Sequence, residues 1–279
     1  MSSEKTIAVF DSGFGGLSVL TQACRRHPEV SYLYYADTDH VPYGLKSNEE
    51  ILRFSDTAVS FLIDQGADAV IMACNTASAV AAQKLRAKYD LPIIAMEPAV
   101  RPAIHEGNSA RVLVMATPVT LREEKLKNLI HREHAEDRID LLPMPGLVVF
   151  AEREEFDSAD VRDYIMQNLS AFPLEEYTAI VLGCTHFNYF RPLLQTLLNE
   201  TCHLPIHLIE GSEGTVRRAE SLLHLSAPAE QMSESCCGKI LSGASADLPT
   251  VRFFRSGREV TDPEDLQHIE RLLQQLQKS

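Results

Sequence analysis

Short apolar runs alternate with amphipathic stretches along almost the whole chain. The runs are typical of buried parallel strands, and the stretches between them carry apolar residues at helical spacing. We expect strands at residues 7–10, 31–36, 69–73, 93–96, 111–116, 139–142, 179–183, 207–209 and 251–254. This alternation predicts an α/β fold with mostly parallel sheets.

Helix signals lie between these strands. Ser47 followed by Glu50 forms a capping-box pattern ahead of an apolar face that begins at Ile51. Asp262 followed by Pro263 is typical of a helix start and predicts a last helix there. Further helices are expected at residues 15–26, 75–88, 118–131, 157–171 and 212–223, and a surface loop at residues 227–246.

The two halves of the chain resemble each other. The strand at residues 7–12 aligns with residues 112–117, and a second pair of strands ends at Cys74 and at Cys184. The members of the two strand pairs are separated by nearly the same number of residues, which favours an internal duplication. Parallel strands also resemble one another by composition alone. We therefore expect two pseudo-symmetric α/β domains, which also suits a chain of 279 residues.

Cys74 and Cys184 lie where a ligand is expected. In open α/β sheets ligands bind just beyond the carboxyl ends of strands, and each cysteine is followed by small polar residues and a helical pattern. A helix N-terminus lowers a thiol pKa and so favours the thiolate. Two such thiols, facing one ligand from opposite sides, suit a two-base proton transfer at a stereocentre. A small buried hydrophobe is the better interpretation of Cys24, Cys202, Cys236 and Cys237.

Two other strand ends carry candidate binding loops. The segment 11–16, Asp-Ser-Gly-Phe-Gly-Gly, permits a tight turn and could present helix N–H groups to a carboxylate. It lacks the G-x-G-x-x-G spacing of a dinucleotide site. The segment 42–44, Pro-Tyr-Gly, could supply a ring wall and a backbone N–H. On their residues alone both segments are better explained as turns, with Asp11 as a helix cap.

Composition narrows the class of protein. A formal net charge of −13 makes nucleic acid and anionic membranes poor partners, although a local site can still bind an anion. We find no leader-like segment and no apolar run of about 18 residues. Six cysteines without C-x-x-C spacing favour a reduced, cytoplasmic protein. Two cysteines and His186 lack zinc-ligand spacing, so no metal is expected.

Four motifs in this order resemble those of glutamate racemases, in the aspartate/glutamate racemase superfamily, and the likeness extends along nearly the whole chain. They lie at residues 11–16, 42–44, 73–78 and 182–187. Thr117 and Thr120 resemble a further Thr-x-x-Thr motif of these enzymes, and Glu152 resembles the glutamate of a Val-Glu pair. The chain departs from the pattern at Ala151, which replaces the valine, and at Asn188, which replaces a proline.

The resemblance implies interconversion of L- and D-glutamate without a cofactor, supplying D-glutamate for peptidoglycan. It implies that Cys74 and Cys184 are the two bases, that Asp11 assists Cys74 and that His186 assists Cys184. Glu152 is expected to join this catalytic group. The substrate-binding residues implied in the same way are Asp11, Ser12, Pro42, Tyr43, Gly44, Asn75, Thr76, Thr117, Thr120, Thr185 and His186.

The resemblance also implies a domain division. One α/β domain would comprise residues 1–97 completed by residues 210–279, the other residues 98–209, with the active site in the cleft between them. A small molecule, glutamate, is the expected partner, and a homodimer is left open.

Three rival functions remain at this stage. An aspartate racemase or related isomerase of the superfamily would share the same cysteines. A cysteine hydrolase with Cys184 as nucleophile would need only one of them and would form a covalent adduct. A non-catalytic amino-acid-binding protein would tolerate the loss of both thiols. The pairing of Cys74 with Cys184 disfavours the last two.

Overall fold

The strands form at the short apolar runs. The computed structural model describes residues 5–106, 111–226 and 250–278. Within these ranges the strands are β1 (Thr6–Asp11), β2 (Ser31–Ala36), β3 (Ala69–Met72), β4 (Ile93–Ala95), β5 (Arg111–Ala116), β6 (Ile139–Pro143), β7 (Tyr177–Gly183), β8 (His207–Ile209), β9 (Val251–Arg255) and β10 (Arg258–Glu259). Every expected strand is confirmed, and β10 was not predicted.

The helices lie between these strands and after them. The α-helices are α1 (Leu17–Arg26), α2 (Asn48–Asp64), α3 (Asn75–Lys88), α4 (Val100–Glu106), α5 (Pro118–Arg122), α6 (Glu124–Arg132), α7 (Pro145–Glu152), α8 (Ala159–Leu169), α9 (Arg191–Thr201), α10 (Ser212–Leu223) and α11 (Pro263–Leu276). Short 3-10 helices are η1 (Tyr43–Leu45), η2 (Leu174–Glu176) and η3 (Thr185–Phe190).

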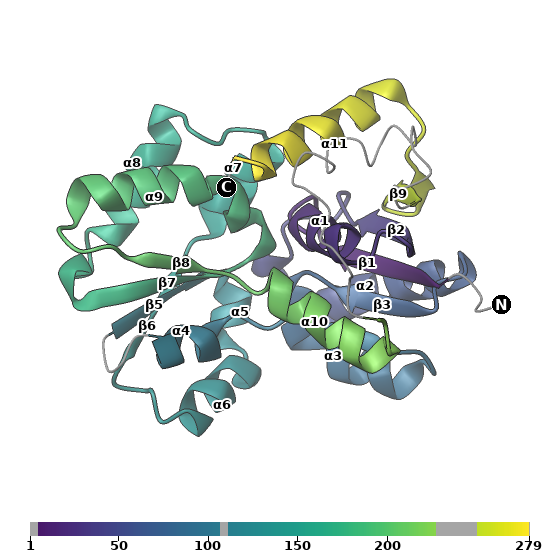
Figure 1. Ribbon diagram of the computed structural model, residues 1–279, viewed down its shortest axis with the longest axis horizontal. Coiled ribbons are helices and arrows are strands. Elements are labelled where there is room, and N and C mark those ends of the chain that lie inside the picture. Colours follow the sequence, from purple (N-terminus) through teal and green to yellow (C-terminus); the bar gives the residue numbers. More distant parts are fainter. Residues whose placement is uncertain (1–4, 107–110, 227–249, 279) are drawn as a thin grey trace.

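Two lobes stand side by side, each around its own sheet (Figure 1). The first sheet has the order β10-β9-β2-β1-β3-β4 and the second the order β6-β5-β7-β8. Among the described strands every pairing is parallel except that of β9 with β10. The expected α/β class with mostly parallel sheets is confirmed.

The duplication is visible in the strand order. The series β2-β1-β3-β4 of the first sheet corresponds to β6-β5-β7-β8 of the second. Strand β9 returns from the C-terminal part of the chain and pairs in parallel with the outer edge of β2. We keep the division into residues 1–97 with 210–279 and residues 98–209 as a proposal, supported by the sheet to which each strand belongs.

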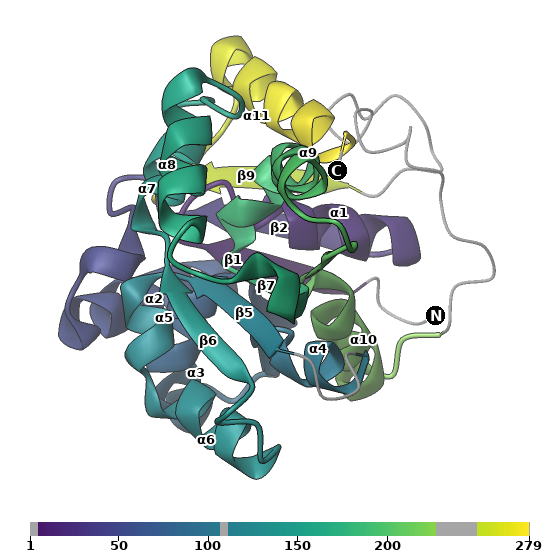
Figure 2. The same cartoon turned by 90° about the vertical axis from the view of Figure 1, so that its left-hand side faces the viewer.

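Each sheet is covered by helices on both faces because its central strands are apolar on both sides. Ile7 and Val9 of β1 pack in the core formed with α1, α10 and α11, whereas Ala8 and Phe10 pack in the core with α2 and α3. The side chains of β5 alternate in the same way, between α7–α9 on one face and α4–α6 on the other (Figure 2). Both sheets are therefore middle layers, and only their strand ends are free to build a site.

The capping signals are confirmed. The hydroxyl of Ser47 accepts from the Glu50 N–H (3.3 Å), and the Glu50 carboxylate accepts from the Ser47 N–H (3.0 Å), which completes the capping box of α2. Asp262 caps α11 by accepting from the Glu264 N–H (2.8 Å). None of the helices in the described ranges is long and apolar enough to cross a membrane.

Some boundaries differ from the expectation. The helix expected at residues 118–131 is two helices, because Glu123 has extended backbone (φ −69°, ψ 138°) and begins α6 as its N-cap. Helix α1 begins at Leu17, with Gly16 as its N-cap, so Asp11 does not cap it. Helices α4 and α7 were not predicted. The loop expected at residues 227–246 lies outside the described residues.

Candidate active site

The predicted chemical groups collect where four strands end. Asp11 is the last residue of β1, Cys74 comes shortly after β3, Thr117 follows β5 and Cys184 follows β7. Strands β1 and β3 are neighbours in the first sheet, and β5 and β7 are the corresponding neighbours in the second. The carboxyl ends of equivalent strand pairs therefore carry the chemistry of each lobe.

Hydrogen bonds join these strand ends across the two lobes. The Thr185 hydroxyl donates to Asp11 Oδ2 (3.0 Å). The main-chain N–H of Phe14 donates to Glu152 Oε1 (3.1 Å). The glycine-rich turn permits this close approach, since a Cβ on Gly15 would lie 2.5 Å from Thr185 Oγ1. The turn packs against the Cys184 segment and forms one side of a shared site.

Cys74 is buried at the start of α3. Its sulfur accepts from the Ala77 N–H (3.4 Å), and its thiol donates to Ser12 Oγ (3.4 Å). Burial raises the pKa of the Cys74 thiol to about 12, and the negative charge of Asp11 adds to that rise. The expected lowering of this pKa by the helix N-terminus is wrong, because the loss of hydration outweighs the single N–H contact.

Asp11 is fully buried. Its carboxylate accepts from the Gly13 N–H (3.0 Å) as well as from Thr185. Burial raises the pKa of Asp11 to about 6, a rise that the positive charge of His186 and the two hydrogen bonds limit. A carboxyl group with this pKa can take up or release a proton near neutral pH.

Cys184 lies beside a buried ion pair. Its sulfur is 3.9 Å from His186 Nδ1, and His186 Nε2 is 2.6 Å from Glu152 Oε1. Burial lowers the pKa of His186, but the hydrogen bonds with Cys184 and Glu152 outweigh it and hold that pKa well above its usual range. The pKa of Glu152 is lowered, since His186 outweighs the effect of burial there too. The raised pKa of His186 favours its protonated form, which can donate from both ring nitrogens.

Three threonine hydroxyls meet at the boundary between the lobes. Thr76 of α3 contacts Thr117 (2.9 Å) and Thr120 (3.2 Å) of α5, and Thr117 contacts Thr120 (3.0 Å). Asn75 precedes Thr76, and its amide nitrogen donates to Met96 Sδ (3.2 Å). The Asn75 amide oxygen is buried and has no hydrogen-bond partner among the described residues. The cluster provides donors and one open acceptor in a site closed to water.

The Pro42-Tyr43-Gly44 segment lies against this cluster. Pro42 precedes η1, and Gly44 sits so close to Thr117 that a Cβ there would be 2.5 Å from the Thr117 Cβ. Tyr43 is buried, and its hydroxyl donates to Asp37 Oδ2 (2.6 Å). The expected position of the segment beside the other substrate-binding candidates is therefore observed, although the Tyr43 hydroxyl is already engaged.

Asp37 is a buried residue near the site that was not among the predicted site residues. It follows β2 directly, and its N–H donates to the Asp11 carbonyl (3.0 Å). The signal that could have identified Asp37 is its position: it is a carboxylate directly after a strand, much as Asp11 is a carboxylate at the end of β1.

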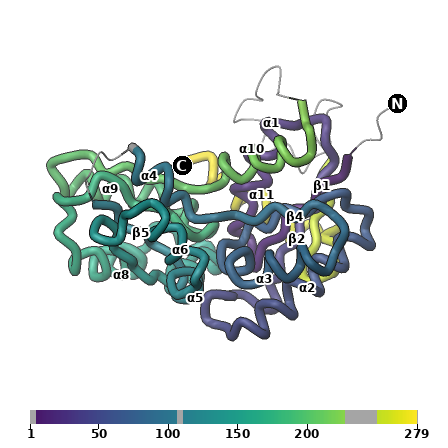
Figure 3. Tube along the Cα trace, turned by 90° about the horizontal axis from the view of Figure 1, so that it is seen from below, coloured from purple at the N-terminus to yellow at the C-terminus, as the bar shows by residue number. Residues whose placement is uncertain are grey.

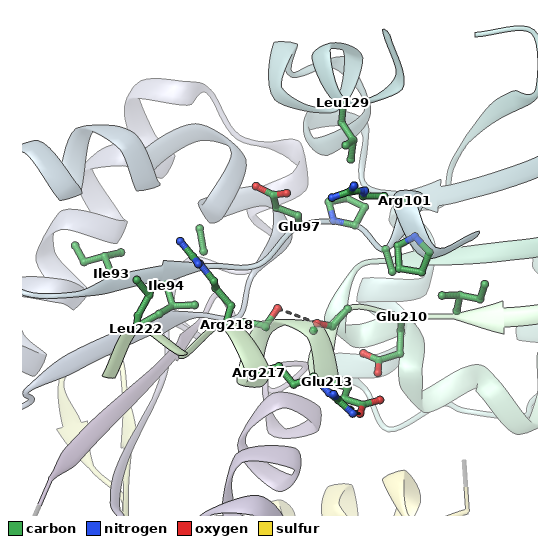
Figure 4. A pocket seen from close by; sticks show the side chains of 18 of the residues that line it. Ile93, Ile94, Glu97, Arg101, Leu129, Glu210, Glu213, Arg217, Arg218 and Leu222 are labelled. Carbon is green, nitrogen blue, oxygen red and sulfur yellow. Dashed lines mark hydrogen bonds and ion pairs between the residues drawn. The ribbon is translucent and has the colours of Figure 1, made fainter. Parts of the chain in front are cut away.

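A cavity of about 1400 Å³ lies elsewhere, where the chain crosses between the lobes (Figure 4). Figure 3 shows the two lobes from below. Glu97, Arg101, Glu210 and Arg218 contribute charged groups to the cavity. Its described lining includes none of the predicted site residues, so the cavity and the candidate active site are separate.

The chain resembles proteins of known family. A family model described as Asp/Glu/Hydantoin racemase matches residues 14–219. The chain is 46% identical over 278 residues to a glutamate racemase of Campylobacter curvus, covering 98% of this chain and 97% of that protein. It is 38% identical over 275 residues to glutamate racemase 2 of Bacillus subtilis, covering 98% and 97%.

Solved structures agree with this grouping. A glutamate racemase of Francisella tularensis in complex with D-glutamate gives a TM-score of 0.74 at 26% identity, covering 97% of this chain and 94% of that one. An Escherichia coli glutamate racemase in complex with L-glutamate and the activator UDP-MurNAc-ala gives 0.72 at 27% identity, covering 92% and 99%. The chain therefore belongs to the Asp/Glu/hydantoin racemase family and groups there with the glutamate racemases, which are isomerases.

Proposed function

We propose that the protein interconverts L- and D-glutamate by proton transfer between Cys74 and Cys184. The observation that carries this proposal is the pairing of two buried thiols at equivalent strand ends of two duplicated lobes, each beside its own acid–base group. The named relatives, two of which were solved with glutamate bound, support glutamate as the substrate.

The reaction needs only one proton removed and one delivered. The thiolate of one cysteine takes the α-proton, so that its S–H bond forms while the substrate C–H bond breaks. The thiol of the other cysteine then gives its proton to the opposite face of the α-carbon. In the reverse direction the two cysteines exchange roles. Asp11 would accept the proton of Cys74 and return it, and His186, held by Glu152, would do the same for Cys184.

Hydrogen-bond donors would stabilise the carbanion. An α-proton is a very weak acid, so the developing charge needs preorganised donors in a site that excludes water. Ser12, Thr76, Thr117 and Thr185 offer hydroxyls, and the Gly44 backbone offers an N–H. The open oxygen of Asn75 suits the substrate ammonium group. With these groups no pyridoxal phosphate or metal ion is needed, and we propose that the enzyme works without a cofactor.

The biological setting follows from the product. We propose that the enzyme supplies D-glutamate for peptidoglycan and works in the cytoplasm, with the amino acid as its small-molecule partner. A homodimer remains a prediction.

The decisive experiment follows L-glutamate by circular dichroism with exhaustively dialysed enzyme. We expect the signal to decay to zero without any addition. An absolute requirement for pyridoxal phosphate or metal would contradict the proposal. Deuterium wash-in at the α-carbon, measured separately for glutamate and aspartate, tests the nearest alternative, because faster exchange into aspartate would identify an aspartate racemase.

A further inference from the structure

Asp37 gathers three hydrogen bonds at one buried carboxylate. It accepts from the Tyr43 hydroxyl (2.6 Å), from His40 Nδ1 (2.9 Å) and from the Ser256 hydroxyl (3.1 Å). Only 3% of Asp37 is exposed, so these contacts are made out of water. Hydrogen bonds to an ionised acceptor are the stronger kind, and a short O–H···O⁻ contact is typical of them.

One of these partners comes from the far end of the chain. Ser256 lies in the turn between β9 and β10, and its own N–H donates to the Ala36 carbonyl (2.9 Å). The Ser256 hydroxyl also accepts from the Asp39 N–H (3.0 Å). The C-terminal hairpin therefore fixes both ends of the short segment that carries Asp37.

A second partner, Tyr43, leads into the candidate active site. Tyr43 is 1% exposed, and its ring packs against Phe10 at a centroid distance of 6.4 Å. Gly44 follows directly and lies against Thr117 of the second lobe, where a Cβ would meet Thr117 Oγ1 at 3.0 Å. A small shift of Tyr43 would move the Gly44 backbone relative to the Thr117 hydroxyl.

We infer that Asp37 is a positioning residue of the racemase: it holds Tyr43, and through Tyr43 it places the Gly44 backbone at the threonine cluster. Ser256 supports Asp37 from the C-terminal hairpin. The side-chain hydrogen bonds of Asp37 do not involve either cysteine. This inference rests on the proposed function. It attributes the geometry of the candidate substrate-binding loop, residues 42–44, to a contact with the C-terminal hairpin.

The test compares Asp37→Asn with Asp39→Asn in glutamate racemisation. Asp37→Asn keeps the shape but loses the charge that Tyr43 contacts, so KM should rise about tenfold, the amount that one such hydrogen bond is worth, while kcat changes far less. Asp39 is the matched control on the same segment, since it pairs with Arg258 (2.8 Å) at the surface, and its variant should leave KM unchanged.

Tyr43→Phe and Ser256→Ala keep the inference testable if Asp37→Asn folds poorly, which thermal unfolding would report. Tyr43→Phe should raise KM as Asp37→Asn does, the double variant should be no worse than either single variant, and Ser256→Ala should act in the same direction more weakly. A fall in kcat at constant KM, additive effects in the double variant, or equal behaviour of the Asp37 and Asp39 variants would overturn the inference alone. A wild-type protein that does not racemise glutamate would overturn the proposed function together with it.

Discussion

The two lobes place a cysteine at the same point of the same strand order, yet they surround it differently. In the first lobe Cys74 contacts the Ser12 hydroxyl and lies near the buried carboxyl of Asp11. In the second lobe Cys184 lies beside His186, which is paired with Glu152. One thiol is thus accompanied by an acid whose pKa is about 6, and the other by a histidine whose pKa is held well above its usual range.

This difference shows what duplication preserves and what it leaves free. The backbone position of each thiol follows from a strand ending at the same edge of equivalent sheets, so both halves keep it. The proton-handling group depends on single side chains, so each half has its own. We therefore expect the two reaction directions to share the thiols but to depend on different assisting residues.

Loss of either thiol should have the largest effect. Cys74→Ser and Cys184→Ser keep the size of the side chain but replace the thiol that exchanges the proton with a hydroxyl, which is a far weaker acid, so we expect racemisation to fall by about a thousandfold or more in each. Circular dichroism of glutamate measures the rate. Cys24→Ser is the control, because Cys24 is equally buried in α1 and far from the strand ends, and it should keep normal turnover. Near-normal turnover in either folded test variant would refute the two-base assignment.

Loss of the assisting groups should have a smaller and directional effect. Asp11→Asn and His186→Asn should each slow proton exchange mainly from one enantiomer, by about 10²–10⁴-fold, because each group serves one thiol. The equilibrium constant between enantiomers cannot change, so the readout is deuterium wash-in from pure L- and pure D-glutamate, by mass spectrometry under initial-rate conditions. Equal slowing from both enantiomers in both variants would mean that the two groups shape the site jointly.

Asp11 should also lower the stability of the folded protein. Its pKa rises from 3.8 to about 6 on folding, so the folded state favours the protonated form and stability falls as pH rises between these values. Asp11→Asn cannot ionise, so its free energy of unfolding should exceed that of the wild type by about 3 kcal/mol above pH 6. The difference should shrink toward pH 4. Denaturant unfolding at a series of pH values measures it, and a constant difference across that range would contradict the prediction.

Much of the fold was predictable because the signals are local. The runs that became β1 and β5 are apolar on both faces, and Ser47 with Glu50 marks the start of α2 within four residues. Helix α7 was missed because Leu147 to Phe150 form a continuous apolar run without helical spacing. The break at Glu123 was missed because the helical pattern continues across it.

The candidate site was predictable to the extent that its residues end strands. Asp11 ends β1, Cys184 follows β7 directly and Cys74 comes two residues after β3, and their types suggest proton transfer. Glu152 ends an apolar helix and gained its expected role only from the family resemblance. Asp37 was not selected because its partner Ser256 lies more than 200 residues away, and no local pattern reports such a contact.

Because β9 pairs with the edge of β2, the first sheet cannot be completed until most of the chain has been synthesised. A ribosome completes β2 early and delivers β9 more than 200 residues later. At about 5–20 residues per second, roughly ten to forty seconds pass before that edge can pair. An unpaired strand edge is a template for association with other chains, whereas the second sheet is made from one continuous stretch and meets no such delay. During synthesis the first lobe is therefore made first but keeps an unpaired strand edge for longest, and this edge is where a newly made chain most needs protection from association with other chains.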